Sequence, residues 1–464
     1  MQKRITRRDF IIKTSHLLGL SGLTGSGTFF QSCKLKKEFT ILIKNAQVVD
    51  ILKNKLIFTD IGITGNIIKT MGKISESRAE VVIEAKGKFI IPGLIDMHVH
   101  FTDQAFSELF LSNGVTSVRD LGNETSFILS LRDKINSGKL EGPSIYASGP
   151  IINNRKIPYG ASFYTIVVKN EEEARRVIRS LAEKKVDWIK IYMTLPGKLV
   201  RTIIMEAQKN NLPVAGHLRK TDARFAAKCG IKTLEHTTGI AEALLGKKDF
   251  VDAPPLQTIS DRVWLHVDKT KYNSLIELLV KKEVYILANL TVFEILASPP
   301  EKIKDVSDVK LMPPHFIKKW KNFIYYRKKN PENWKMTKNR IEEFLLLFKN
   351  KGGKILAGTD TPWPLLIPGI SLHRELELLV EAGLSSQEAL LAATFYPAEA
   401  LGQMKNIGTI EEGKRADLII LKKNPLHNIS NTKNIEITIK DGKIIHRKEQ
   451  LPRIPNRYMP SYFK

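Results

Sequence analysis

Short apolar runs alternate with amphipathic stretches along the middle of the chain. After a first run at residues 89–100, seven more have lengths that suit buried strands, at residues 115–118, 144–147, 188–192, 213–215, 233–234, 284–290 and 354–357. Apolar positions with helical spacing lie between several of them, at residues 171–185, 198–210 and 272–283. Repeated strand–helix units over about 300 residues predict an α/β fold, a (β/α)8 TIM barrel.

Both ends of the chain read as β-strands instead. Strands are predicted at residues 40–49, 60–71, 416–421, 435–439 and 443–445, with turns at Gly65-Asn66 and Asp441-Gly442. Two strand-rich ends around a different middle predict one small β-sandwich domain formed from both chain ends. The expected boundaries are a signal at residues 1–33, the sandwich at 34–90 and 405–450, the barrel at 91–404, and a tail at 451–464.

The first segment carries an export pattern. TRRDFIIK at residues 6–13 resembles the twin-arginine signal, and the Gly/Ser-rich stretch after it is too short and interrupted to span a bilayer. FFQSC at residues 29–33 resembles a lipoprotein cleavage box, although Phe30 departs from the usual aliphatic residue. The alternative is an ordinary basic N-terminus. The pattern predicts twin-arginine export to the periplasmic side, with the protein anchored to the membrane by a lipid on Cys33.

Composition is that of a folded globular protein, with 42% hydrophobic and 26% charged residues, but the formal net charge is +25. Such a charge can indicate a nucleic acid or an anionic membrane as partner. The lysines are dispersed and no aromatic–basic module accompanies them, so we expect no nucleic-acid partner. If Cys33 is lipidated, Cys229 is the only thiol and no intrachain disulfide can form; we expect Cys229 at a helix end, buried and inert.

Candidate chemistry begins where the first apolar run ends in His-x-His. Residues two apart on a strand point the same way, so His98 and His100 present both imidazoles on one side. Two convergent imidazoles at the C-terminal end of a strand make half of a metal site. The ordinary alternative is a pair of hydrogen-bonded core histidines.

Four more polar residues occupy predicted strands or follow them directly. They are Lys190, His217, His236 and Asp360. Each alone has an ordinary explanation: a surface lysine, two core histidines and a helix-capping aspartate. Barrel enzymes build their sites at the C-terminal strand ends, so we expect all six side chains to converge there. Imidazoles and carboxylates are ligands that suit zinc and similar divalent ions.

With these residues the sequence resembles the amidohydrolase superfamily, in its imidazolonepropionase-like and Xaa-Pro dipeptidase-like branch. The resemblance covers residues 39–447. Its motifs are IPGLIDMHVH at residues 91–100, WIKI at 188–191, LEH at 234–236, AGTD at 357–360 and IGTIEEGKRADL at 407–418. The last resembles the family's return from the barrel to its β-sandwich. These motifs are specific for the superfamily and much less so for a substrate.

The resemblance implies a dinuclear metal centre, with zinc as the expected metal. His98, His100 and Asp360 would hold the first ion, and His217 and His236 the second. Lys190, carboxylated by CO2, would bridge the two ions, because a carbamate offers two anionic oxygens where a neutral amine is a poor ligand. A hydroxide shared by the ions would attack the scissile carbonyl. Asp360 would act as general base and then as general acid toward the leaving nitrogen.

Substrate recognition is weakly specified by the sequence. Arg219, two residues after His217, could grip a substrate carboxylate, and a surface role is at least as compatible with the pattern. Tyr192 and Asn289 lie near strand ends and are further candidates for the pocket lining. His373 is expected to be structural or to support the ligands. The loop at residues 150–164 departs from the Gly/His-rich form associated with dipeptidase-like members.

Three functional hypotheses remain from the sequence. The leading one is a metal-dependent amidohydrolase that cleaves the carbon–nitrogen bond of a small-molecule amide or a dipeptide, Xaa-Pro among them. A mononuclear deaminase or an imidazolonepropionase-like ring opener is the alternative within enzymes, and the bridging Lys190 argues against it. A non-catalytic, metal-binding exported lipoprotein is the third, and the complete ligand set argues against that. The sequence does not define the oligomeric state.

Overall fold

The computed structural model describes residues 37–156, 164–245, 263–298, 307–318, 320 and 331–446. The predicted export signal, Cys33 and the C-terminal tail lie outside these residues, so export, lipidation and the outer domain boundaries stay predictions. Within the described ranges, none of the helices combines the length and apolar composition that crossing a membrane requires.

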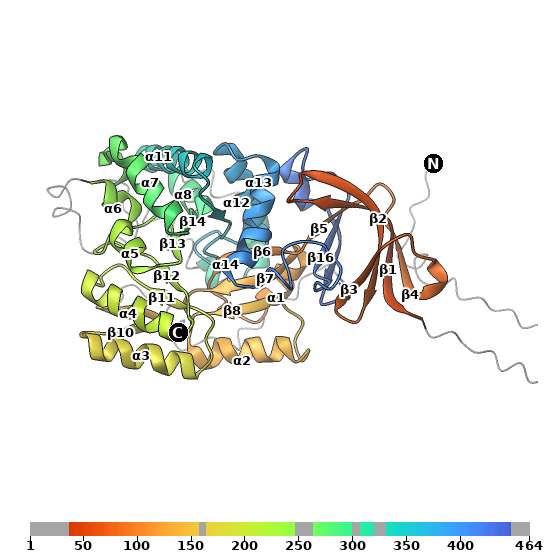
Figure 1. Cartoon of the computed structure of the whole chain (residues 1–464), viewed down its shortest axis with the longest axis horizontal. Coiled ribbons are helices and arrows are strands. Elements are labelled where there is room, and N and C mark those ends of the chain that lie inside the picture. The colour runs from red at the N-terminus through yellow and green to blue at the C-terminus, as the bar shows by residue number, and fades with distance from the viewer. Residues whose placement is uncertain are drawn as a thin grey trace, which may run out of the picture. The chain divides into compact units, whose positions relative to one another are not determined.

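Strands from both ends of the described chain form one eight-stranded sheet (Figure 1). Its strands are β1 (Phe39–Asp50), β2 (Lys55–Thr64), β3 (Ile67–Gly72), β4 (Ala79–Glu84), β5 (Phe89–Pro92), β16 (Leu418–Leu421), β17 (Ile435–Lys440) and β18 (Lys443–Ile445). They follow the order β18-β17-β16-β5-β1-β2-β3, with β4 parallel to the first half of β1. The early and late parts of the chain join where β16 pairs antiparallel with β5.

Branched apolar residues make the core of this small β domain. Ile43 on β1, Ile63 on β2 and Ile420 on β16 belong to one buried cluster. On the edge strand β3, Ile68 donates its backbone N–H to the carbonyl of Lys414, which ties this edge to the segment before β16. The expectation of a small β domain made from both ends is confirmed.

The middle of the chain forms the predicted barrel. Its eight strands are β6 (Leu94–Val99), β7 (Val115–Asp120), β8 (Ser144–Ala147), β11 (Ile189–Ile191), β12 (Val214–Gly216), β13 (Thr233–Glu235), β14 (Tyr285–Leu287) and β15 (Ile355–Leu356). The strands from β11 to β15 pair in parallel, as do β6, β7 and β8. The ring closes where Asp360 donates its N–H to the carbonyl of His98 at 2.7 Å, and where Asp187 donates to Ala147 at 2.8 Å.

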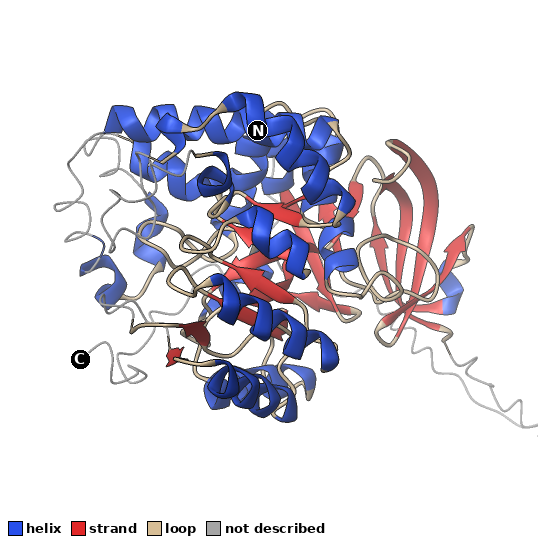
Figure 2. Cartoon of the chain, turned by 60° about the vertical axis from the view of Figure 1, so that its left-hand side comes forward, coloured by secondary structure: helices blue, strands red, loops and turns tan. Residues whose placement is uncertain are grey.

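Helices surround these strands, which occupy the centre of the barrel in Figure 2. They are α1 (Phe106–Ser112), α2 (Thr125–Asn136), α3 (Glu171–Glu183), α4 (Gly197–Lys209), α5 (Ala223–Cys229), α6 (Ile240–Leu244), α7 (Tyr272–Lys281), α8 (Leu290–Ala297), α11 (Pro331–Asn350), α12 (Ile370–Glu381), α13 (Ser386–Ala392) and α14 (Phe395–Ala400). Short strands β9 (Ile151–Asn153) and β10 (Thr165–Val167) extend the sheet beside β11. The predicted helices at 171–185, 198–210 and 272–283 are α3, α4 and α7.

Five short 3-10 turns complete the described elements. They are η2 (Glu76–Arg78), η3 (Trp264–His266), η4 (Lys269–Lys271), η5 (Ser307–Leu311) and η6 (Ile429–Lys433). The sequence of the segment after β14 is dense in lysine, tryptophan and tyrosine at residues 316–329, a pattern that predicts a helix there as a lid over the barrel mouth. Of that segment, Phe316 and Trp320 are buried, and the ring of Phe316 lies 5.7 Å from that of Phe106 on α1. Most of the remainder lies outside the described residues.

The apolar run at residues 89–100 is divided between the two domains. β5 belongs to the small sheet and β6 to the barrel, and Gly93 between them donates its N–H to the carbonyl of Asp417 at 2.8 Å. A Cβ at Gly93 would lie 2.1 Å from Oγ1 of Thr116. Glycine is therefore required here by a close approach to β7, and the strand that carries the histidines starts directly at the domain junction.

Replacing Gly93 with alanine is expected to lower the free energy of unfolding by about 1–3 kcal/mol, because the added methyl overpacks the junction. Urea unfolding of the purified protein measures the change. Adding Thr116→Ala removes the two nearest side-chain atoms and should restore part of the loss. Equal stability of Gly93→Ala and the wild type would contradict the packing argument.

One expectation about a side chain is wrong. Cys229 does end α5, followed by Gly230 in the left-handed conformation, but the thiol residue is only partly buried. The helix face that points to the core is formed by Ala223, Ala226 and Ala227, so Cys229 lies at the edge of that face.

Candidate metal centre

The six predicted ligand residues come from five barrel strands and lie at the ends of those strands or inside them. His98 is in β6 and His100 follows it, Lys190 is the middle residue of β11, and His217 and His236 directly follow β12 and β13. The imidazole centroids of His98 and His236 are 4.6 Å apart, and those of His217 and His236 are 4.8 Å apart. The structure therefore brings the four histidines together at one end of the barrel.

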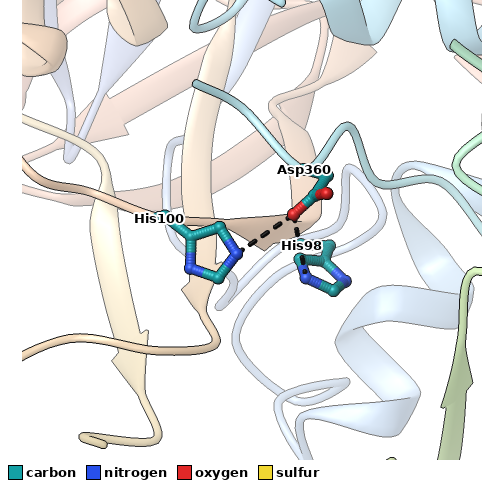
Figure 3. Close-up of side chains that lie close together, drawn as sticks. All are labelled: His98, His100 and Asp360. Atoms are coloured by element: carbon teal, nitrogen blue, oxygen red, sulfur yellow. Dashed lines mark hydrogen bonds and ion pairs between the residues drawn. The ribbon is translucent and has the colours of Figure 1, made fainter. Parts of the chain in front are cut away.

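Asp360 joins this group from the segment after β15. Its Oδ1 lies 3.0 Å from Nε2 of His100 and 3.3 Å from Nε2 of His98. Figure 3 draws both contacts as dashed lines. Its Oδ2 lies 3.9 Å from Nε2 of His236. Ligand atoms of His98, His100 and Asp360 all lie within 4.8 Å of one another, and all three residues are buried. This His-His-Asp group could hold a metal ion.

The backbone at two of these residues is strained. Asp360 has φ 65° and His236 has φ 56°, in the left-handed region that residues with a Cβ rarely adopt. Each such residue costs about 1–3 kcal/mol and persists where the surroundings fix it, often at functional sites. The strain turns both side chains toward the other ligand residues.

Lys190 is buried, and its amine forms no hydrogen bond with any described residue, although Glu235 and Asp360 are near enough to act on its charge. Only 1% of the residue is exposed, and its Nζ has no hydrogen-bond partner within the part of the chain that the structure describes. Burial lowers its pKa to about 8. Lys440, another buried lysine, instead lies 2.7 Å from Asp441 and 3.3 Å from Asp417. An unpartnered buried amine is costly, so Lys190 needs an explanation beyond packing.

The residues present fit a divalent cation. Nδ1 of His98 lies 2.7 Å from Glu235, and Nδ1 of His100 lies 3.3 Å from the carbonyl of Gly122, so both Nε2 atoms face Asp360. Metal-binding histidines characteristically use their second nitrogen in this way. Burial lowers the pKa of His98 and of His236 well below the usual value, which favours the neutral imidazole that binds metals. The unpartnered Lys190 is the sixth polar residue of this group.

Comparison with known proteins agrees with this geometry. The model of the Amidohydrolase family matches residues 89–445 of the 464. The chain belongs to the amidohydrolase family. It is accordingly a hydrolase that acts on carbon–nitrogen bonds, and the superfamily resemblance of the sequence is confirmed.

Individual relatives of this amidohydrolase are distant. It is 24% identical to the ochratoxinase of Aspergillus niger, over 73% of this chain and 71% of the relative. It is 22% identical to the imidazolonepropionase of Clostridium tetani, over 87% of this chain and 94% of the relative. The crystal structure of a Xaa-Pro dipeptidase with bound methionine in the active site aligns with a TM-score of 0.67 at 24% identity, covering 87% of this chain and 99% of that one. This likeness shows the barrel fold.

Two acids of the amidohydrolase that were not predicted from the sequence, Asp96 and Glu235, contact the candidate ligand residues or their neighbours. Asp96 accepts hydrogen bonds from the backbone N–H and the hydroxyl of Thr359, at 3.0 and 2.8 Å, and from the N–H of His98 at 3.2 Å. Burial raises the pKa of Asp96 to about 7. Glu235 contacts His98 directly. Both acids interrupt apolar strands one or two residues before a ligand histidine, and that position is the signal that could have found them.

Of the substrate-binding candidates, Tyr192 is buried with its ring 4.5 Å from that of His217, next to the ligand group. Arg219 is half-buried; burial lowers its pKa, opposed by the negative charge of Glu242. Asn289 is buried and donates to the carbonyl of Gly358 at 2.9 Å, two residues before Asp360. The substrate role of each stays a prediction.

His373 of the amidohydrolase has a structural position, in agreement with one of the two roles expected of it. Its Nε2 donates to the carbonyl of Asn113 at 3.1 Å, and its Nδ1 lies 3.0 Å from the hydroxyl of Thr432. It thereby joins α12 to the end of α1 and to η6. Burial lowers its pKa from 6.5 to about 4.

This pKa shift predicts a pH-dependent stability. Between pH 6.5 and 4 the unfolded chain binds a proton at His373 that the folded chain does not, so this residue's contribution is lost as the pH falls. The loss should reach on the order of 3 kcal/mol across the window. Chemical denaturation of the wild type and of His373→Gln across this pH range isolates the effect, because the other titrating groups are common to both proteins and only the wild type carries His373. Parallel stability curves would contradict the prediction.

Proposed function

We propose that this amidohydrolase cleaves an amide or dipeptide bond with a pair of divalent ions, zinc being the expected metal. The observation that carries the proposal is the buried group of His98, His100 and Asp360, together with the amine of Lys190, which forms no hydrogen bond with any described residue and lies close enough to Asp360 to interact with its charge. By this proposal the His-His-Asp group holds one ion, and His217 and His236 hold the other. Lys190, as a carbamate, would be the sixth ligand.

The bound ions would supply a water of lowered pKa and would polarise the scissile carbonyl. The chain itself contributes the proton transfers. Asp360 has one carboxylate oxygen beside His98 and His100 and the other nearer to His236, which suits a group that takes a proton and delivers it to the leaving nitrogen. The burial of the ligand residues limits the access of bulk water to the reacting bond.

The substrate class follows from the family and not from a particular contact. The relatives include an ochratoxinase and a Xaa-Pro dipeptidase, and we propose for this chain a small amide or dipeptide, Xaa-Pro among the candidates. Tyr192 beside His217, and Arg219 two residues after it, are the side chains proposed to contact the substrate.

Two measurements test the proposal. Elemental analysis of the purified protein should find about two divalent ions per chain, consistent with a two-metal site. A screen of the metal-loaded protein against dipeptides, including Xaa-Pro dipeptides, cyclic amides and lactams should find a hydrolysed substrate. An ion count of one or none would reject the dinuclear centre, and the absence of hydrolysis of any amide in the screen would count against the proposed substrate class.

A mononuclear ring opener is the second candidate. It is favoured by one observation, that His98, His100 and Asp360 by themselves suffice for an ion. The likeness to an imidazolonepropionase fits the same reading. A single bound ion together with hydrolysis of a cyclic amide, and not of a dipeptide, would select it.

A further inference from the structure

A buried ion pair lies directly behind His98. Glu235 places Oε2 2.7 Å from Nδ1 of His98 and Oε1 3.0 Å from Nη2 of Arg119. Arg119 and Glu235 are both fully buried. Arg119 comes from β7, Glu235 from β13 and His98 from β6, so the contacts join three strands of the barrel.

The donors and acceptors of this cluster leave one consistent arrangement. A guanidinium has no acceptor, so Arg119 donates to Oε1 of Glu235 and, through Nη1, to the hydroxyl of Thr233 at 3.1 Å. The Thr233 hydroxyl then donates its own hydrogen to Oε1 at 2.5 Å. Oε2 is left as the acceptor for Nδ1 of His98. The imidazole therefore carries its hydrogen on Nδ1 and keeps the lone pair of Nε2, which faces Asp360.

Arg119 has little freedom to change this arrangement. Its Nε donates to the carbonyl of Met97 at 2.7 Å, immediately before His98 in the chain. Its guanidinium lies over the ring of Trp188, 4.4 Å from the centroid. A buried ion pair is weak evidence for stability, since apolar residues of similar size often serve as well. The contact between Glu235 and His98 gives this ion pair a role other than stability.

We propose that Arg119 and Glu235 are positioning residues that hold His98 in the Nδ1–H tautomer, so that Nε2 is available to a divalent cation. Glu235 accepts from the imidazole, and Arg119 determines which side of Glu235 can accept. The inference rests on the proposed role of His98 as a metal ligand.

The decisive variant is Glu235→Gln. Its amide has one donor end and one acceptor end, and Arg119 repels the donor end, so the amide NH2 must face Nδ1 of His98. The imidazole then carries its hydrogen on Nε2 and loses that atom as a ligand. Zinc binding, measured by competition of Zn²⁺ alone against a chelator, should weaken by about 10–100-fold, as for other residues that orient metal ligands.

A second substitution should reverse the defect. In Arg119→Met/Glu235→Gln nothing repels the NH2 end, the amide can turn, and its oxygen can again accept from His98. Zinc affinity should return to within about tenfold of the wild type. Glu206→Gln is the matched control, because Glu206 is also buried and paired with an arginine, Arg179, but lies on α4. If Arg119 and Glu235 formed only a structural ion pair, replacing Arg119 as well would not restore zinc affinity.

The tautomer itself provides a readout that is independent of activity. In the full chain labelled with ¹⁵N-histidine and freed of metal, the His98 resonances, assigned with His98→Gln, should show hydrogen on Nδ1 in the wild type and on Nε2 in Glu235→Gln. An unchanged tautomer in Glu235→Gln would overturn the inference. So would a folded double variant that binds zinc no better than Glu235→Gln. If the wild type binds no zinc, the proposed function fails, and the spectra still decide the tautomer.

Discussion

Replacing Asp360 with asparagine is expected to reduce turnover by about 10²–10⁴-fold while the fold is retained. Asparagine has the size of aspartate but cannot take up a proton at the position beside His98 and His100. The backbone N–H of Asp360, which closes the barrel onto His98, is unchanged by the substitution. Steady-state kinetics on the substrate found in the screen measures the loss, and the thermal unfolding midpoint checks the fold.

Asp222→Asn is the matched control for this prediction. Asp222 caps α5 by accepting from the N–H of Phe225 at 2.8 Å, and an asparagine oxygen can accept the same bond. Its turnover should equal that of the wild type. Full activity in Asp360→Asn would exclude this residue as the proton carrier, whatever the metal content.

Replacing Lys190 with alanine is the second change with a large expected effect. If Lys190 reaches both ions as a carbamate, its loss should lower the ion count from about two to one or fewer and reduce turnover at least about 100-fold. The substitution removes a buried amine that forms no hydrogen bond with any described residue. The free energy of unfolding of the metal-free protein should therefore fall less than it does when one partner of a buried ion pair is removed.

The same variant allows a chemical test of the carbamate. A short carboxylic acid such as acetate or formate has the two oxygens of a carbamate and can enter the space that the lysine side chain leaves. Adding it to Lys190→Ala should restore part of the metal content and of the turnover. Lys440→Met is the comparison, since it removes a buried lysine that is paired with Asp417 and Asp441 and should affect stability alone. Two ions in untreated Lys190→Ala would refute the bridging role.

The barrel and the positions of the six polar residues were accessible from the sequence because both depend on local patterns. Short apolar runs fix the strands, and a polar residue at the end of such a run is placed at the barrel rim by the fold itself. His217 after β12 and His236 after β13 are found in this way.

The contacts of Arg119 and Glu235 behind His98 could not be predicted from the sequence, because these residues are far apart along the chain. Arg119 and Glu235 are 116 positions apart, and nothing in the sequence around either residue indicates the other. The sequence boundary between residues 90 and 91 falls inside β5, and the true division at Gly93 could not be located for a related reason. Both halves are equally apolar, and only the distant partner β16 assigns β5 to the small sheet.

The contacts between the first and last barrel strands also set the order in which this protein can mature. Asp96 and Thr359 are 263 positions apart, and their hydrogen bonds lie beside the one by which Asp360 reaches His98. A nascent chain that ends before β15 can neither shut the ring nor present a complete His-His-Asp group. Contacts between residues so far apart in sequence form slowly, because the entropy of closing the long loop between them must be lost first. Capture of a cation by the His-His-Asp group would therefore follow synthesis of nearly the whole polypeptide, and a product shortened before β15 would lack both the closed ring and the complete group.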